Sequence, residues 1–236
     1  METLKIMKLA IMQPTYIPWC GYFALMDYVD KFILLDDVEF DTRSWQQRNK
    51  IKTANGELWL TIPVKKKNKS KQLLNNVEIL NNEFTKKHLN SIKFNYSKTK
   101  YFSDYYPKLE EILNSENTLL CDLTIPIIEW IKETLSIETK IIRSSSIVGT
   151  AKKADYLVKI CIENQANEYI SPPGSKNYIQ DAEAFKKNNI TVKYFIYDHP
   201  KYKQQYGEFI PYLSFIDFLF NNGPNTKEIF KKISIQ

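Results

Sequence analysis

The sequence predicts an α/β protein whose mainly parallel sheet is flanked by helices. Short runs rich in Ile, Val, Leu, Phe and Tyr alternate with segments of helical periodicity along most of the chain. Strand, helix and strand over residues 8–36 form the opening of a parallel unit, as in Rossmann-like folds and nucleotidyltransferases. No linker rich in Pro, Gly or Ser divides the chain, so we expect residues 1–236 to form a single domain.

The predicted elements follow from periodicity and from the turn residues that bound them. Strands are expected at 7–13, 31–36, 57–64, 140–143, 168–171 and 191–197. Helices are expected at 20–29, 84–96, 104–114, 122–135, 152–163, 180–188 and 225–233. The mostly helical stretch near 81–135 is predicted to be an insertion or cap. Asn55-Gly56 between two strand-like runs predicts a hairpin, because both residues accept a positive φ.

Composition indicates a soluble globular protein. Hydrophobic residues make up 43% and charged residues 25% of the 236 residues, and the net charge is +6. The lysine-rich stretch 65–71 is either a solvated loop or a patch for phosphate, nucleic acid or an anionic membrane. Cys20, Cys121 and Cys161 are too widely spaced for a zinc motif and predict free thiols in a reducing cytoplasm. We expect no signal peptide, membrane span or metal site, and the oligomeric state stays open.

Polar and aromatic side chains follow the first predicted strand directly. Gln13 and Thr15 offer hydrogen-bonding groups, and Gly21 allows close backbone approach where a helix begins. The flat faces are those of Tyr16, Trp19 and Tyr22. The alternative is a structured turn with buried aromatics. A glycine-rich dinucleotide motif and a P-loop are both absent, and residues 18–22 lack the histidines of an HxGH nucleotidyltransferase motif.

A second polar group follows the next strand. Asp36 and Asp37 either cap a turn or hold a hydroxyl, an amine or a metal. Arg43, Arg48 and Lys50 come soon after them, and arginine suits bidentate binding of phosphate or carboxylate. Trp45 and Asn49 lie in the same stretch. A ligand with a pyrophosphate would satisfy this set.

The later strands also end in polar residues. His199 follows a strand beside Asp198 and is the preferred acid or base; His88, on a predicted helix, is the second choice. Ser171, Gly174 and Tyr178 belong to a turn that either presents amides and hydroxyls to an anion or is plainly structural. Arg143-Ser144-Ser145-Ser146 follows another strand on the same expected edge.

These motifs resemble the WbqC-like family over nearly the whole chain, from about residue 8 to 224. The residues that carry the resemblance are Met12–Phe23, Leu35–Phe40, Arg43–Lys52, Asn55-Gly56, Trp59–Val64, Arg143–Ser145, Tyr169–Ser171, Gly174, Tyr178, Tyr197, His199-Pro200 and Asn221–Pro224. The family is associated with gene clusters for bacterial surface polysaccharides such as O-antigen. The resemblance therefore implies a cytoplasmic step on a nucleotide-linked amino sugar.

Three functions are compatible with this resemblance. The first is an N-acyl or aminoacyl transferase acting on a 4-amino-4,6-dideoxy sugar, with an acyl-CoA or an aminoacyl-tRNA as donor. In it Arg43, Arg48 and Lys50 hold phosphates, Trp19, Trp45 or Tyr22 stacks on sugar or base, and an aspartate receives the amine. His199 or His88 then accepts a proton. The second is an ATP-dependent ligase on the same substrate. The third is a non-catalytic nucleotide-sugar-binding protein.

Overall fold

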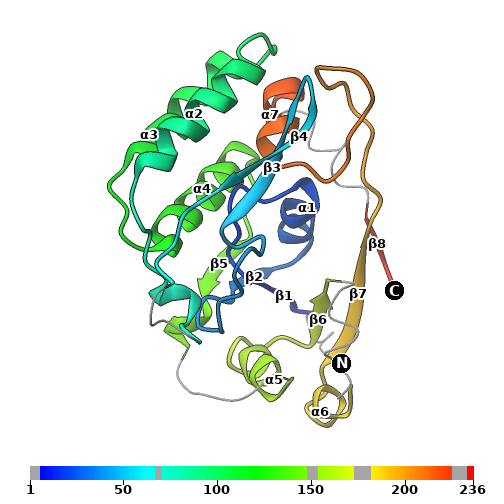
Figure 1. Ribbon diagram of the computed structural model, residues 1–236. Helices are drawn as coiled ribbons and strands as arrows, with labels where there is room; N and C mark the ends of the chain where they lie inside the picture. The colour runs from blue at the N-terminus through cyan, green and yellow to red at the C-terminus, as the bar shows by residue number, and fades with distance from the viewer. Residues whose placement is uncertain (1–5, 67–70, 148–153, 173–181, 225–232) are drawn as a thin grey trace.

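The computed structural model describes residues 6–66, 71–147, 154–172, 182–224 and 233–236. Its main sheet has six strands in the order β5-β2-β1-β6-β7-β8 (Figure 1). Five of them run parallel, and the last pairs antiparallel with its neighbour. The strands are β1 Lys8–Met12, β2 Lys31–Leu34, β5 Lys140–Arg143, β6 Glu168–Ser171, β7 Thr191–Tyr197 and β8 Ile233–Ile235. The predicted α/β class with a mainly parallel sheet is confirmed.

Alternating side chains give the sheet two buried faces. Ala10, Phe32 and Ile170 join the larger core, which packs against α1 (Cys20–Tyr28), α4 (Leu120–Thr134) and α7 (Phe215–Asn222). Leu9, Ile33 and Tyr169 join the smaller core under α5 (Ala154–Glu163) and α6 (Ala182–Lys187). Helices therefore cover both faces, as expected of a parallel sheet.

The predicted helical segment near 81–135 is present and contains three helices. These are α2 (Glu83–Tyr96), α3 (Phe102–Asn114) and α4, which stack along one side of the molecule (Figure 1). Their buried side chains belong to the same hydrophobic core as one face of the sheet. The segment is therefore packed onto the sheet layer, which makes it part of the same core.

The predicted hairpin is also present. β3 (Arg48–Thr53) pairs antiparallel with β4 (Gly56–Thr61) in a separate sheet. Of the two turn residues expected to take a positive φ, Gly56 alone does so, at 98°. The first strand begins at Arg48, so Arg48, Asn49 and Lys50 lie on the hairpin and not in the loop before it. Backbone pairing with β4 fixes their directions.

Two elements near the C-terminus were not predicted. Five of the eight residues of α7 are Phe, Leu or Ile, and they lie too close together in the sequence to show helical periodicity. The helix expected at 225–233 lies outside the described residues except for Ile233, which begins β8. Gly149 and Thr150, near the expected start of α5, also lie outside them. None of the helices in the described ranges has the length and hydropathy needed to cross a membrane.

Candidate functional site

The order of the strands places one point of the sheet where a ligand site is expected. From β1 the chain proceeds outward through β2 to β5 and then returns to the other side of β1 with β6. The strand order therefore reverses between β1 and β6, which is the point where parallel α/β sheets hold their ligands. Because the pairing is parallel, the loops after β2, β5 and β7 lie at the same edge. The carboxyl ends of the five parallel strands, which the polar motifs were predicted to follow, therefore share one edge.

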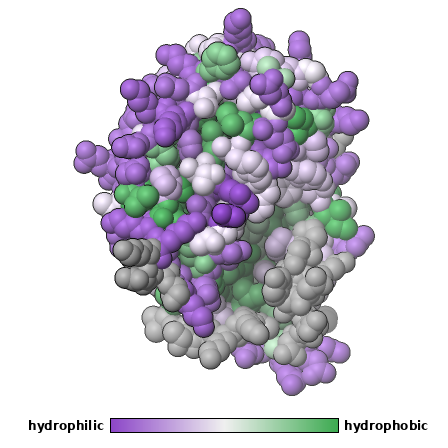
Figure 2. Space-filling model, viewed as in Figure 1, coloured by the Kyte–Doolittle hydropathy of each residue, from purple (hydrophilic) through white to green (hydrophobic). Residues whose placement is uncertain are grey.

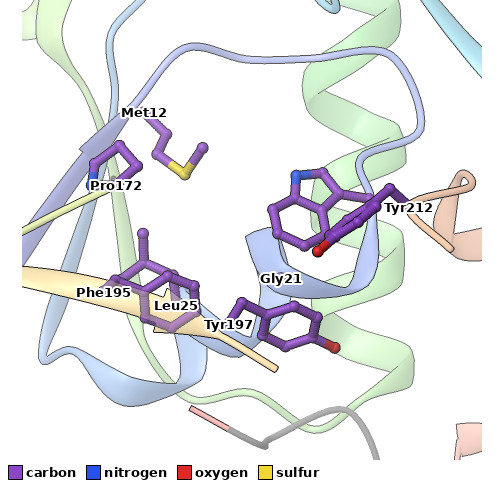
Figure 3. Close-up of a pocket in the computed structure, with 8 residues that line it drawn as sticks. Met12, Gly21, Leu25, Pro172, Phe195, Tyr197 and Tyr212 are labelled. Atoms are coloured by element: carbon purple, nitrogen blue, oxygen red, sulfur yellow. The ribbon is translucent and has the colours of Figure 1, made fainter. Parts of the chain in front are cut away.

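A pocket of about 300 Å³ lies at this point, and Met12 of β1 and Pro172 after β6 both line it. Figure 3 shows these two residues with Leu25 and Phe195 at one end, and Tyr197 and Tyr212 at the other. Viewed as in Figure 1, the surface is hollowed over the middle of the sheet, and the floor of the hollow is hydrophobic (Figure 2). An apolar, aromatic pocket of this kind suits a flat ring or the apolar face of a sugar.

Gly21 determines the position of one wall of the pocket. A Cβ at this residue would lie 2.1 Å from Cη2 of Trp19, so the outer ring of the indole rests directly against the start of α1. The indole also meets Tyr197 and Tyr212 edge to face, with ring centroids 5.1 and 5.4 Å apart. The predicted close approach at Gly21 is therefore used by the protein's own Trp19.

Next to the pocket, the ends of β2 and β5 carry a group that we call the carboxylate cluster. It contains Asp36, Asp37, Arg143, Ser144, Ser145 and Tyr156. Arg143 Nε donates to Asp36 at 2.7 Å, and Ser145 donates to Asp36 through its backbone N–H at 2.9 Å and its hydroxyl at 2.7 Å. Ser144 and Tyr156 donate their hydroxyl hydrogens to Asp37.

The two aspartates differ in exposure and in charge balance. Asp36 is fully buried, whereas Asp37 is partly exposed at the edge. Burial alone would raise the pKa of Asp36, but the hydrogen bonds from Ser145 and Arg143 outweigh it and hold that pKa below its ordinary value. The hydroxyl of Tyr156 has its pKa raised to about 12 by burial and by Asp37. Two carboxylates and one guanidinium give the cluster a net charge of −1.

The loop from β2 to β3 is held by two buried glutamines. Gln46 Oε1 accepts from the backbone N–H of Asp41, and its Nε2 donates to Gln13 Oε1 at 2.8 Å. Gln47 accepts from the backbone N–H of Arg43 at 3.1 Å. The first loop and the second are therefore tied together at the edge of the sheet, and the side chain of Gln13 forms part of the tie.

Four predicted binding residues are buried and engaged within the protein. Tyr16 and Tyr22 are at most 1% exposed, and Asn49 donates from Nδ2 to the carbonyl oxygens of Tyr16 and Ile17. Ser171, at the end of β6, is also buried. Thr15 lies half-buried in the first loop. These side chains support the walls of the site, and the prediction that they contact a ligand stays a prediction.

Arg48, Lys50 and two tryptophans gather on the outer face of the hairpin instead of at the strand ends. Arg48 Cζ lies 4.3 Å and Lys50 Nζ 5.0 Å from the ring centroid of Trp59. Trp45 and Trp59 have ring centroids 5.3 Å apart. Arg43 is exposed in the preceding loop, at a φ of 64°. Among the described residues neither arginine forms an ion pair.

Both histidines are hydrogen-bonded within the protein, His199 through both ring nitrogens. His199 Nδ1 is 3.0 Å from the carbonyl oxygen of Pro200, and its Nε2 accepts from the backbone N–H of Tyr212 at 3.1 Å. His88 Nδ1 is 2.9 Å from the hydroxyl of Tyr16, and the ring also meets the backbone of Thr61. Burial lowers the pKa of both rings, that of His88 to about 4.

The structure thus brings some predicted residues together and separates others. Asp36, Asp37, Trp19 and Gln13 lie at the strand ends, and His199 lies beside Trp19 with ring centroids 6.4 Å apart. His88 lines a separate groove between β4 and α2. Gly174 and Tyr178 lie outside the described residues. In the described ranges no three His, Cys, Asp or Glu side chains gather as a metal ion would require.

Sequence reasoning missed the tyrosines of the site. Tyr156 enters the cluster from α5, and Tyr212 reaches the pocket from a segment with no regular secondary structure. The chain contains 15 tyrosines, and nothing in their local sequence separates these from the rest. Only the packing of α5 and of the segment after β7 onto the sheet edge identifies them.

Comparison with known proteins places the chain in a family without giving it an activity. Residues 13–229 match the model of the WbqC-like protein family. The chain is similar to "Uncharacterized protein Rv1507c" of Mycobacterium tuberculosis, at 36% identity over 218 residues, which are 92% of this chain and 94% of that protein. No solved structure matches the chain.

Proposed function

Because the chain belongs to the WbqC-like protein family, we propose that it is a cytoplasmic enzyme of bacterial surface-polysaccharide biosynthesis. The proposed reaction is transfer of an acyl or aminoacyl group to the amine of a nucleotide-linked amino sugar, such as a 4-amino-4,6-dideoxyhexose. One observation carries the proposal. An aromatic pocket and a negatively charged carboxylate cluster lie at the ends of neighbouring strands, on the single edge where this sheet would hold a ligand.

The charge of the cluster supports an amine as the group that is recognised. Its net charge of −1 favours an ammonium over a phosphate, and Asp37 is the carboxylate that reaches the surface. Asp36 is already paired with Arg143 and is fully buried. We therefore assign the sugar amine to Asp37. The aromatic walls of the pocket take the sugar ring or the base.

The chemistry requires the amine to lose protons. An ammonium that binds Asp37 must become a neutral amine before its lone pair attacks the acyl carbon. The C–N bond then forms, the bond from the acyl carbon to the donor's leaving group breaks, and the leaving group takes up the amine's second proton. Asp37 is placed to accept the first proton. His199 can accept one only after its Nε2 gives up the backbone N–H of Tyr212.

The engaged histidines favour one alternative, a non-catalytic protein that binds the nucleotide sugar. Such a protein would need the pocket and Asp37 but no free base. A ligase that activates a carboxylate with ATP stays a second alternative, although residues 18–22 lack the histidines of the nucleotidyltransferase motif. The three functions differ in what they consume.

Mass spectrometry separates them. The purified protein is incubated with a dTDP-linked 4-amino-4,6-dideoxyhexose and, in separate reactions, acyl-CoA, aminoacyl-tRNA, or ATP with a carboxylic acid. We expect an N-acylated sugar with one of the first two donors, and loss of the product in Asp37→Asn but not in Asp104→Asn, an exposed carboxylate on α3. Product that forms only with ATP and releases AMP selects the ligase. Binding without product selects the non-catalytic protein.

A further inference from the structure

The outer face of the β3–β4 hairpin carries a surface that the pocket and the carboxylate cluster do not use. We call it the tryptophan face and define it by Trp45, Arg48, Lys50, Trp59 and Lys87. Trp45 is 47% and Trp59 39% exposed, although tryptophan is usually well buried. Two neighbouring exposed indoles form a contiguous apolar patch, and such patches mark interaction sites.

Register explains how this face forms. Lys50 pairs with Trp59 across the hairpin, and Arg48 is two residues along the same strand, so all three side chains leave the ribbon on the same side. The guanidinium of Arg48 lies over the ring of Trp59 at 4.3 Å from the centroid. Cationic and aromatic groups therefore alternate along one side of a two-stranded ribbon.

A groove extends the tryptophan face toward α2. It has a volume of about 440 Å³, and Trp59 of β4 and Lys87 of α2 both line it. Lys50 is partly neutralised by Glu57 at 2.7 Å, but among the described residues Arg48 and Lys87 have no carboxylate partner. Glu83 also lines the groove and balances the charge of Lys87, so the net positive charge of this surface comes from Arg48 on the hairpin. Cations beside exposed aromatic rings are the arrangement with which proteins bind single-stranded nucleic acid.

The tryptophan face adjoins the strand ends. The carbonyl oxygen of Trp45 accepts from the backbone N–H of Tyr16 at 3.0 Å, and the next residue, Gln46, donates to Gln13 at 2.8 Å. Gln13 directly follows β1, whose end lines the pocket. A chain that stacks on Trp45 would therefore meet the edge that holds the carboxylate cluster.

From these contacts we propose that the tryptophan face binds the single-stranded 3′ end of an RNA. The inference rests on the proposed function and deepens it, because it makes the donor an aminoacyl-tRNA. The sugar amine would attack the ester carbon, the amide C–N bond would form, and the C–O bond to the terminal ribose would break. The ribose hydroxyl takes up one proton, so the tRNA leaves uncharged. Bases stack on Trp45 and Trp59, and Arg48 and Lys87 contact phosphates.

The test is a binding measurement that needs no catalysis. A fluorescently labelled, short single-stranded RNA ending in CCA is titrated with the purified protein, and anisotropy is followed at several salt concentrations. We expect Trp45→Ala and Trp59→Ala each to weaken binding by about fivefold to a hundredfold, the range found when one stacking aromatic is removed. Arg48→Gln should lower the slope of log K against log salt by about 0.7, the value for one phosphate on a single strand.

Controls separate this surface from general effects. Ile162→Ala removes an exposed apolar side chain from α5, and Lys140→Ala removes an exposed cation from the edge strand β5. Both should leave the affinity unchanged within a factor of two or so. Equal RNA affinity in the wild type and both tryptophan variants overturns the inference, as does absence of RNA binding at low salt. Displacement of the RNA by free CoA at equal potency, or self-association through this face, also overturns it.

Failure of the RNA-binding proposal and failure of the proposed function give different results. RNA binding that depends on the tryptophans, with no transfer to any amino sugar, supports the RNA-binding surface and contradicts the proposed reaction. Transfer from acyl-CoA by a protein that does not bind the RNA supports the proposed reaction and contradicts the RNA-binding surface.

Discussion

Two fully buried aspartates, Asp36 and Asp217, respond to the same burial in opposite ways. Burial raises the pKa of each, but at Asp36 hydrogen bonds from Ser145 and the cation of Arg143 outweigh it, and the pKa falls. Asp217 accepts from the hydroxyl groups of Tyr96 and Tyr202, both at 2.7 Å, and these neutral donors do not outweigh burial, so its pKa is raised.

This difference distinguishes a structural carboxylate, Asp217, from a carboxylate at the candidate site, Asp36. Asp217 lies on α7 and joins it to α2 and to the segment after β7, so its bonds are all spent on holding elements together. Asp36 lies at a strand end beside the partly exposed Asp37, and Arg143 keeps 41% of its side chain exposed. Asp36 therefore has a directly bonded cation, whereas Asp217 accepts hydrogen bonds from neutral donors alone and the nearby cation of Lys52 does not outweigh its burial.

The largest expected effect on stability comes from removing the carboxylate of Asp217. Asp217→Ala leaves the hydroxyl groups of Tyr96 and Tyr202 without their acceptor, whereas Gln204 Nε2 keeps the carbonyl oxygen of Ile210 at 2.9 Å. Each unpaired buried donor costs about 1–3 kcal/mol, so we expect the free energy of unfolding to fall by about 3 kcal/mol or more. Urea denaturation measures this. Asp104→Ala on the exposed side of α3 should change it by less than about 1 kcal/mol. A similar small loss at Asp217 would remove the distinction between the two aspartates.

A second buried group, His88, should stabilise the fold in a pH-dependent way. His88 has its pKa lowered to about 4 by burial, below the ordinary 6.5, so between these values the unfolded chain binds more protons than the folded one. Stability is therefore complete above the unfolded pKa and is lost as pH falls. We expect a loss of about 2 kcal/mol between pH 7 and pH 5. Thermal or urea unfolding of the wild type and of His88→Gln isolates the contribution of His88, because all other titratable groups are the same in the two proteins. Parallel curves for the two proteins would contradict the assignment.

At the pocket, a substitution that displaces the ring of Trp19 should affect ligand binding more than folding. Gly21→Ala places a Cβ 2.1 Å from the outer ring of Trp19, so the indole must move into the pocket. We expect about tenfold weaker binding of a dTDP-linked amino sugar, measured by calorimetry, with a stability loss of about 1–3 kcal/mol from overpacking. Trp19→Phe in the same protein removes the clashing ring and should recover part of the stability. Unchanged affinity in Gly21→Ala would mean that the ligand does not use this pocket.

The sequence predicted what periodicity and strand ends can show. Apolar runs followed by polar motifs located the edge at Gln13, Asp36, Arg143 and Ser171, and parallel pairing brought these motifs together because equivalent ends of parallel strands coincide. The same reasoning identified Asp36 and Asp37 as a pair at the end of a strand. Their separation into one buried and one partly exposed carboxylate depends on Arg143 and Ser145, more than a hundred residues away.

Side-chain direction could not be predicted from the residue types. Tyr16 and Trp45 belong to polar, aromatic loops of similar composition, yet one is buried and the other 47% exposed. Lys52 is 2% exposed and donates to Gln204 at 3.0 Å, although a lysine in an alternating strand predicts a solvent-facing residue. Hairpin register and long-range packing decide these cases, and neither is encoded within a short window of sequence.

Recognition of the sugar amine is the role that we propose for Asp37 at the sheet edge. Calorimetry with a dTDP-linked 4-amino-4,6-dideoxyhexose and with its 4-hydroxy counterpart tests it in wild type and in Asp37→Asn. The wild type should prefer the amino sugar by about tenfold or more, since a charged hydrogen bond adds about 1.5–3 kcal/mol. Asp37→Asn should bind the two sugars equally, with its affinity for the hydroxy sugar unchanged. A preference for the amino sugar that survives Asp37→Asn would contradict the account.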